Sequence, residues 1–536
     1  MASKVNNTSK SSKTAAENKA EKKPAATKNT ATKATDKKPT ASKIATASKK
    51  PAAKKPAEAS KPNAATAENK TAKKILFVTA EAFPFAGTGG LGEVAGSLPK
   101  ALNNVGADCR VIMPLFGSIA EKYRQKMTYI GQTHVMVGWR NQYCGLFSLT
   151  NDGVTTYFVD NEYYFKRDGI YGHFDDGERW AFFCRAVLEA IPLVGFKPDV
   201  IHSNDHATAL VPVYYKTEYA SRYGYNGIKN VFTIHNLEYQ GCYPSFILGD
   251  VFGIAEHDRW IVDFNWELNC VKGAIESADK VTTVSPTYAK EIQTPERGYG
   301  LHDILCRNAG KLSGILNGVN VEEYNPEKNT SIAKHYSAAD TSGKTECKAA
   351  LKKECGFEDD KPIVAVISRL AGHKGLDLVK GLLEREWLGR ANIVILGTGE
   401  KYLEDFFAWY GGSHKSAKTF ITYNKDLAHR IYSGADMFLM PSGSEPCGLS
   451  QMMACRYGTI PIVRRTGGLA DSIHDCRSGG GNGFVFDDYT VEALCDTVNA
   501  AIDLYYKKEW KELMLRAMNC DFTWDRSAVE YMRLYE

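Results

Sequence analysis

The chain has 536 residues, which is more than one hydrophobic core usually supports, so we expect two large domains. No run of about 18 apolar residues occurs and no apolar segment resembles a signal peptide, so neither a membrane span nor secretion is expected. The 13 cysteines form no Cys-x-x-Cys pair and the histidines lack metal-binding spacing, which predicts reduced thiols, no metal site and a cytoplasmic protein.

The net charge of +5 is unevenly distributed. Residues 1–72 contain 17 lysines, no arginine and five acidic residues, a net of +12, which leaves −7 for residues 73–536. The same segment has no aromatic residue and cannot bury enough apolar surface to order itself, so we predict a disordered basic tail. A solvated tail is favoured over loose contact with polyanions, and no specific nucleic acid is expected as a partner. Because the tail lacks arginine, a plastid transit peptide is disfavoured.

From Lys73 onward, short apolar runs alternate with stretches of helical pattern. The runs are 75–78, 199–201, 231–234 and 281–284 in the first half, and 363–367, 393–396, 437–440 and 460–463 in the second. Unalternating runs rich in β-branched residues are typical of parallel strands buried on both faces. The pattern therefore predicts an α/β protein with two Rossmann-like, doubly wound parallel-sheet domains facing across a cleft. A polar stretch places the break between them near residues 325–345.

The tetrapeptide Thr-Gly-Gly-Leu occurs once in each half, as Thr88, Gly89, Gly90 and Leu91 and as Thr466, Gly467, Gly468 and Leu469. Each copy lies between an apolar run and a predicted helix, where paired glycines let the backbone approach a ligand. The N–H groups of a following helix would point at an anion. Two turns facing one ligand are one interpretation, and two unrelated tight turns are the other.

Polar residues follow several of the predicted strands. They occupy 202–206 and 235–236 in the first half, and 368–369, 374 and 441–449 in the second. Ligands of open α/β sheets bind beyond the carboxyl ends of the strands, so we expect these groups to converge on one inter-domain cleft.

Five segments resemble bacterial glycogen synthases and plant starch synthases, namely 74–102, 233–241, 285–326, 368–379 and 441–471. The resemblance implies two domains of GT-B type, 73–325 for the acceptor and 326–519 for the nucleotide sugar, with a final helix at about 520–536 that returns to the first. It also implies a retaining hexosyltransferase that moves glucose from ADP-glucose to the 4-hydroxyl of an α-1,4-glucan. No cofactor and no metal are implied.

The resemblance also implies roles for individual residues. Arg369 and Lys374 match the pair that binds the diphosphate, where cations stabilise the charge that grows on the leaving group. Glu445 matches the glutamate that holds the glucose hydroxyls, and His235 matches the histidine beside the transferred sugar.

Donor binding is assigned to the two glycine turns, with Gly87, Thr88, Gly89, Gly90, Thr466, Gly467, Gly468 and Leu469. The acceptor and sugar pocket is assigned to Glu93, Asn204, Asp205, Asn236, Cys447 and Gly448. Cys447 is expected to be a packing thiol and not a nucleophile. Only Glu445 is a candidate carboxylate, so we expect a front-face displacement and no covalent sugar intermediate.

Several positions depart from the family pattern. Gly87 stands where a lysine is usual, Glu93 replaces an aspartate, and His206 replaces a tryptophan. Ser444 replaces a phenylalanine and Asn320 an aspartate. These departures leave open a related transferase that uses UDP-glucose, and a glucan-binding protein of weakened activity.

Two further classes are disfavoured. A phosphorylase would need a lysine that holds pyridoxal phosphate, and no residue suggests one. A nicotinamide dehydrogenase would need a Gly-x-Gly-x-x-Gly motif after its first strand, and the chain has none there.

Overall fold

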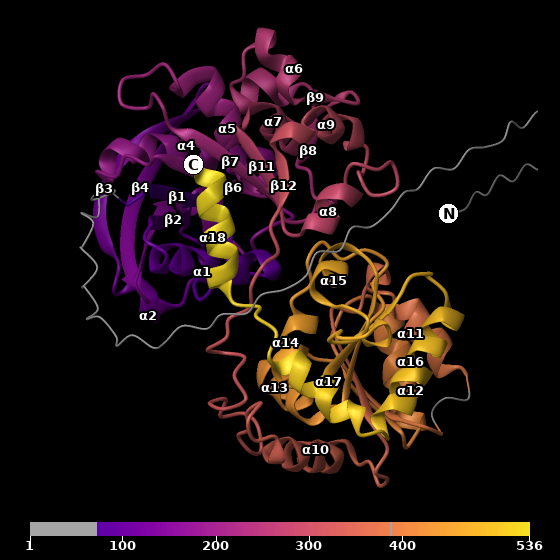
Figure 1. Cartoon of the computed structure of the whole chain (residues 1–536). Helices are drawn as coiled ribbons and strands as arrows, with labels where there is room; N and C mark the ends of the chain where they lie inside the picture. Colours follow the sequence, from indigo (N-terminus) through magenta and orange to yellow (C-terminus); the bar gives the residue numbers. More distant parts are fainter. Residues whose placement is uncertain (1–71, 386–388) are drawn as a thin grey trace, which may run out of the picture. The chain divides into compact units, whose positions relative to one another are not determined.

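The computed structural model describes residues 72–385 and 389–536 (Figure 1). The predicted disordered tail, residues 1–72, lies outside the described residues except for Ala72. No helix in the described ranges has both the length and the apolar character needed to cross a membrane.

The first half of the described chain forms a nine-stranded sheet in the order β12-β11-β7-β6-β1-β2-β5-β4-β3. Its strands are β1 (Lys74–Val78), β2 (Asp108–Pro114), β3 (Thr128–Val137), β4 (Arg140–Asn151), β5 (Val154–Asp160), β6 (Val200–Asn204), β7 (Lys229–Ile234), β11 (Lys280–Thr283) and β12 (Leu312–Gly314). From β12 at one edge to β5, each strand in this order runs parallel to its neighbours. The strands at its centre are buried along nearly their whole length, as unalternating apolar runs predict.

Strands β3, β4 and β5 lie outside the predicted set, and they pair antiparallel at one edge of the sheet. Asp152 and Gly153 form the turn between β4 and β5, both with positive φ, as in a type I′ hairpin turn. This Asp-Gly pair was a usable sequence signal. The exposed and buried residues of β3 are mixed, so that strand gives no apolar run to recognise.

The second half forms a six-stranded, fully parallel sheet in the order β15-β14-β13-β16-β17-β18. Its strands are β13 (Ile363–Ile367), β14 (Asn392–Leu396), β15 (Ala417–Phe420), β16 (Met437–Met440), β17 (Ile460–Arg464) and β18 (Phe484–Phe486). All eight predicted apolar runs lie on strands, and their ends agree within one residue except that β6 ends three residues later and β7 begins two residues earlier. The predicted α/β class with two doubly wound parallel sheets is therefore confirmed.

Helices connect most successive parallel strands, as such sheets require, and others precede the antiparallel edge or follow the last strand. They are α1 (Gly90–Asn104), α2 (Glu121–Arg124), α3 (Glu162–Phe165), α4 (Asp176–Leu193), α5 (Leu210–Tyr214), α6 (Arg259–Val262), α7 (Cys270–Ser277), α8 (Pro286–Glu291), α9 (His302–Arg307), α10 (Ser342–Cys355), α11 (Leu376–Leu383), α12 (Lys401–Ser413), α13 (Lys425–Gly434), α14 (Ser450–Arg456), α15 (Gly467–Ser472), α16 (Val491–Tyr505), α17 (Glu509–Met518) and α18 (Trp524–Tyr535).

The last helix, α18, lies beside α1 and the first sheet (Figure 1). Its Tyr535 hydroxyl is 2.7 Å from Nδ1 of His202 on β6, and its Ser527 hydroxyl donates to the carbonyl of Leu316. The described chain forms one compact unit by its internal contacts, so the boundaries proposed at residues 325 and 519 stay predictions.

A small antiparallel sheet lies between β7 and α7 in the chain. It consists of β8 (Cys242–Pro244), β9 (Asp263–Phe264) and β10 (Glu267–Asn269), in the order β8-β10-β9. The turn that joins β9 to β10 consists of Asn265 and Trp266. None of these strands is among the predicted runs.

Candidate active site

Lys374 and Glu445 form an ion pair in the second half. Lys374 ends a short 3₁₀ turn (Gly372–Lys374) after β13, and Glu445 lies in the loop after β16. The Nζ of Lys374 is 2.7 Å from Oε2 of Glu445, and the Ser442 hydroxyl donates to the same oxygen at 3.1 Å. The Glu445 side chain is only 8% exposed. These contacts hold the carboxylate in one place, with a cation beside it.

Arg369 lies on the same loop as Lys374 but is exposed to solvent. Within the described ranges, its guanidinium makes no ion pair and no hydrogen bond to a side chain or backbone oxygen. An arginine in this position presents a planar fork of N–H donors to an incoming phosphate. Arg369 and Lys374 thus lie on one loop, directly after β13.

The second Thr-Gly-Gly-Leu turn supports the loop that carries Glu445. The N–H of Gly468 donates to the carbonyl oxygens of Glu445 and Pro446, both at 3.2 Å. A carboxylate from the first half, Glu291 on α8, accepts from the N–H of Gly467 at 2.9 Å and from the Thr466 hydroxyl at 3.0 Å. In this structure the polar donors of the turn are therefore bonded to protein oxygens.

Helices α8 and α15 cap one another at this contact. While Glu291 of α8 accepts from the first turn of α15, Asp471 of α15 accepts from the N–H and the hydroxyl of Thr287 on α8, at 2.7 and 2.6 Å. Each carboxylate thus lies at the positive end of the other helix, where it is stabilised. The Ser285 hydroxyl adds a bond to the carbonyl of Pro446. For the Thr466 hydroxyl and the Gly467 N–H to bind the donor, as predicted, Glu291 would have to leave.

The first Thr-Gly-Gly-Leu turn is arranged differently. Both carboxylate oxygens of buried Glu81 accept from Thr88, from its N–H at 2.6 Å and its hydroxyl at 2.9 Å. Gly89 and Gly90 are exposed, with open space where a Cβ would lie, and α1 begins at Gly90. Gly87 packs against the Phe83 ring, 3.0 Å from its ideal Cβ. This turn offers exposed backbone but no cation.

Asn204, Asp205, His235 and Asn236 form one cluster at the ends of β6 and β7. A carboxylate oxygen of Asp205 accepts from the N–H of His235 at 2.8 Å and of Asn236 at 3.5 Å. The Nε2 of His235 donates to the side-chain oxygen of Asn204 at 2.9 Å. Burial raises the pKa of Asp205 to about 7, against the opposing effect of these backbone donors. The structure therefore brings together four predicted residues from two strands.

Burial also keeps the histidines of this region neutral. It lowers the pKa of His202 and of His235 to about 3, and that of His206 to about 4. The ring of His202 lies between two hydroxyls, with Nδ1 2.7 Å from Tyr535 and Nε2 2.6 Å from Thr233. A neutral imidazole suits this position because each hydroxyl can donate or accept.

Acid should therefore destabilise the fold through these rings. Their folded-state pKa values lie below the unfolded value, so the stabilisation is complete above pH 6.5 and is lost as the pH falls. For each buried neutral histidine, the free energy of unfolding falls by about 1.4 kcal/mol for every pH unit below 6.5, until the folded-state pKa is reached. For His202→Gln we expect the difference in unfolding free energy between pH 6.5 and 5.0 to shrink by about 2 kcal/mol. Urea titrations at both values measure it, with exposed His134→Gln as the control. An unchanged difference in His202→Gln would contradict the assignment.

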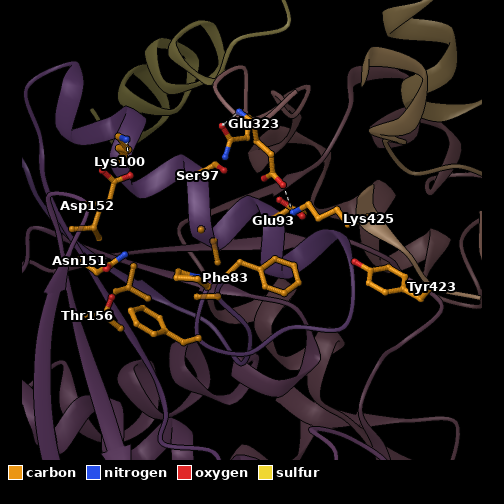
Figure 2. A pocket seen from close by; sticks show the side chains of 18 residues that line it. Phe83, Glu93, Ser97, Lys100, Asn151, Asp152, Thr156, Glu323, Tyr423 and Lys425 are labelled. Carbon is orange, nitrogen blue, oxygen red and sulfur yellow. Dashed lines mark hydrogen bonds and ion pairs between the residues drawn. The ribbon is translucent and has the colours of Figure 1, made fainter. Parts of the chain in front are cut away.

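Glu93 does not join this cluster. It lies on α1 and lines a cavity of about 500 Å³ together with Glu323, Tyr423 and Lys425 (Figure 2). Lys425 forms an ion pair with Glu323. Burial raises the pKa of Glu93, and nearby Lys425 opposes that shift. Neither Glu445 nor His235 lines this cavity.

Cys447 and Gly448 follow Glu445 directly. Burial raises the pKa of the Cys447 thiol to about 12, so the sulfur is uncharged and a poor nucleophile. The side-chain amide of Gln451 donates to the carbonyls of both residues, at 3.2 and 2.9 Å. In the described ranges, no group of three or more histidine, cysteine, aspartate or glutamate side chains is arranged to hold a metal ion.

Comparison with known proteins gives two matching families. Residues 74–307 match the starch synthase catalytic domain, and residues 348–513 match glycosyl transferases group 1. A glycogen synthase of Anoxybacillus flavithermus is 45% identical over 473 residues, which cover 86% of this chain and 97% of the relative. A glycogen synthase of Streptococcus mutans is 44% identical over 472 residues, covering 86% and 99%.

The chain belongs to the glycogen and starch synthase family.

Solved structures agree with this assignment. The catalytic domain of starch synthase IV from Arabidopsis thaliana, bound to ADP and acarbose, is 34% identical with a TM-score of 0.80, covering 87% of this chain and 99% of that one. A sucrose-phosphate synthase of Thermosynechococcus elongatus is 15% identical with a TM-score of 0.56, covering 86% and 98%, and shares the fold. The predicted family, the glycosyltransferase class and the GT-B type fold are therefore confirmed.

Three residues that the motifs of a glycogen synthase do not reveal hold the Glu445 loop in place. They are Glu291, Arg297 and Arg464. Arg464 donates to the carbonyls of Ser442 and Gly443, at 2.9 and 2.7 Å. Arg297, from the first half, donates to the carbonyl of Gly443 at 2.6 Å. Burial, and secondly the charge of Arg297, lower the pKa of Arg464. Arg464 lies two residues before the second glycine turn in the sequence, but no sequence signal linked Glu291 or Arg297 to that turn.

The turn under this synthase's Glu445 should tolerate no side chain at Gly467. The residue has φ +43°, and an ideal Cβ would lie 1.9 Å from the carbonyl oxygen of Glu445. For Gly467→Ala we expect a loss of more than about 3 kcal/mol of unfolding free energy, together with activity. Urea unfolding measures the first and a transfer assay the second.

Gly412→Ala is the matched control, because Gly412 lies in α12 with open space at its Cβ position. That change should be neutral or stabilise by up to about 1 kcal/mol. Wild-type stability and activity in Gly467→Ala would show that the turn does not support the loop.

Proposed function

We propose that this protein transfers glucose from ADP-glucose to the 4-hydroxyl at the non-reducing end of an α-1,4-glucan, with retention at the anomeric carbon. The observation that carries the proposal is the buried Glu445 carboxylate bonded to Lys374, with exposed Arg369 on the same loop. The chain is also 45% identical to a protein named glycogen synthase, and similar to a starch synthase solved with ADP and acarbose.

The proposed chemistry needs charge stabilisation more than a second carboxylate. As the sugar–phosphate bond breaks, negative charge grows on the diphosphate, and Arg369 and Lys374 would stabilise it. The leaving oxygen would take the proton of the acceptor hydroxyl on the same face of the sugar. Glu445 would hold the glucose hydroxyls, and His235, kept neutral by burial, would lie beside the ring as a hydrogen-bond partner.

The contacts of the two glycine turns favour different roles. The second turn is bonded to Glu291 and to the Glu445 loop, whereas Gly89 and Gly90 are exposed at the start of α1. A helix N-terminus attracts anions through its unpaired N–H groups and its dipole. We therefore assign the diphosphate to the first turn together with Arg369 and Lys374, and assign the second turn to support.

The decisive experiment is glucan elongation. Purified protein is incubated with glycogen and radiolabelled ADP-glucose or UDP-glucose, and label in precipitated glucan is counted. Incorporation from ADP-glucose supports the proposal. Preference for UDP-glucose would support the alternative donor, for which the absent lysine at Gly87 is the motivating observation. No incorporation from either donor, with glycogen still bound, would leave a glucan-binding protein.

We further propose that transfer requires no metal ion. The rate should stay within about two-fold after EDTA treatment, since two cationic side chains supply the charge that a metal would otherwise supply. The measurement is initial-rate transfer before and after chelation. Loss of activity that Mg²⁺ restores would overturn this prediction.

Two finer expectations rest on sequence and similarity alone. A cytoplasmic location is proposed from the bacterial glycogen synthases that the chain resembles and from its cysteine usage. Loose, salt-sensitive contact of the basic tail with polyanions is proposed from its net charge of +12.

A further inference from the structure

The turn between β9 and β10 carries a tryptophan in a strained backbone conformation. Asn265 and Trp266 have φ values of +50° and +70°, as in a two-residue type I′ hairpin turn. Asn-Gly is the usual sequence of such turns, because a bulky residue in the left-handed region is strained. Trp266 is also 94% exposed, so packing within the protein does not compensate for the strain. A strained residue that gains no packing energy is typical of a position that contacts a ligand.

A second exposed aromatic lies at the same end of this small sheet. Strand β8 pairs antiparallel with β10, and the Ser245 hydroxyl that follows β8 donates to the carbonyl of Trp266 at 2.6 Å. The next residue, Phe246, is 80% exposed. Both rings therefore project from adjacent connections at one end of the sheet.

The other end of β8 borders a cavity beside the predicted catalytic cluster. This cavity of about 640 Å³ is lined by the first two residues of β8, Cys242 and Tyr243, and by Glu238 and Tyr239 of the loop that begins at His235. Ser245 lies three residues beyond Cys242, a span of about 10 Å along the strand. The strand thus connects the cavity with the two exposed rings.

The lining of this cavity suits an uncharged polyhydroxyl chain. Tyr239 and Tyr299 are about half exposed, and neither lysine nor arginine is among its lining residues in the described chain. His206 also lines it, and its buried Nδ1 has no hydrogen-bond partner in the described part of the chain. Acidic and aromatic groups without a cation disfavour a phosphate-bearing ligand. Sugar rings offer hydroxyls to polar groups and an apolar C–H face to aromatic rings.

We propose that Trp266 and Phe246 form an outer glucan-binding platform, which holds the acceptor chain beyond the cavity lined by Tyr239, Tyr299 and His206. The identity of the occupant, an α-1,4-glucan, rests on the proposed function. Such a platform favours long or branched acceptors, because only they reach from the cavity to the end of β8. Short maltooligosaccharides fill the cavity without touching it.

Trp266→Gly tests the platform without endangering the fold, since Asn-Gly is the preferred sequence for this turn. We expect unchanged or higher thermal stability. Mobility in a glycogen-containing native gel should increase, and KM for glycogen should rise about five-fold, the scale of one lost aromatic contact. Kinetics with maltotriose and KM for ADP-glucose should not change. Phe246→Ala should act in the same direction, and exposed Tyr506→Ala is the control.

Wild-type glycogen affinity and KM in both Trp266→Gly and Phe246→Ala would overturn the proposal. Equal losses with maltotriose and glycogen would overturn it too, because they would place the effect in the cavity. The gel requires no catalysis, so it decides between the platform and its absence even if no glucose is transferred. Failure of the proposed function would appear separately, as absent incorporation by the wild-type protein.

Discussion

Arg369→Ala is expected to lower kcat/KM for ADP-glucose by about 10²–10³-fold, the usual cost of losing one preorganised donor to a charged transition state. Arg369 is exposed beside the buried Lys374–Glu445 pair and has no protein partner in the described ranges, so its charge remains available for substrate. Because the side chain supports no other contact there, thermal stability should not change. Initial rates at varied ADP-glucose and a melting curve measure both quantities.

Arg385→Ala is the control for that experiment. Arg385 is another exposed arginine of the second half, paired with Glu492 at the end of α11. A surface ion pair contributes little, so the rate should stay within about two-fold of wild type. Equal rates for Arg369→Ala and the wild-type protein would remove Arg369 from the transferring site.

Glu291→Ala is expected to lower kcat by about ten-fold or more, although Glu291 itself is assigned no contact with substrate. Its carboxylate holds Thr466 and Gly467, and the next residue of that turn holds the carbonyls of Glu445 and Pro446. Losing the acceptor leaves a buried N–H unpaired and loosens the loop that fixes Glu445. KM for ADP-glucose should change less than kcat, since Arg369 and Lys374 remain.

Glu291→Gln should recover most of the activity, because the amide oxygen can accept the same two hydrogen bonds. Exposed Glu296→Ala, in the segment that follows α8, should behave as wild type. A positioning role requires this order of effects. If glutamine were as damaging as alanine, charge and not hydrogen bonding would be the property that matters. If neither change affected kcat, Glu291 would have no positioning role.

Eight parallel strands could be predicted because each contains an apolar run that is buried on both faces, whereas β2, β12, β15 and β18 were not among the predicted runs. Strands β3 and β4 could not, because they lie at the sheet edge with mixed exposure. The sequence motifs also identified Arg369, Lys374 and Glu445. The structure places Arg369 and Lys374 on the loop after β13, and Glu445 on the loop after β16.

The different contacts of the two glycine turns could not be predicted from the sequence. The tetrapeptides are identical, yet one is exposed at the start of α1 while the donors of the other are bonded inside the protein. Whether an N–H group is available depends on its neighbour in space, and Glu291 is 175 residues away from Thr466. The surroundings of Glu93 could not be predicted for the same reason, because Lys425, which lines the same cavity, belongs to the second half.

The reciprocal capping of α8 and α15 has an evolutionary consequence. Glu291 with Thr466, and Thr287 with Asp471, act as two coupled side-chain pairs although each pair is distant in sequence. A substitution that removes one carboxylate leaves an unpaired donor on the other helix, so a compensating change there is favoured. Among relatives, these positions should therefore covary, and chimaeras that join halves from diverged parents should lose activity unless both pairs are matched.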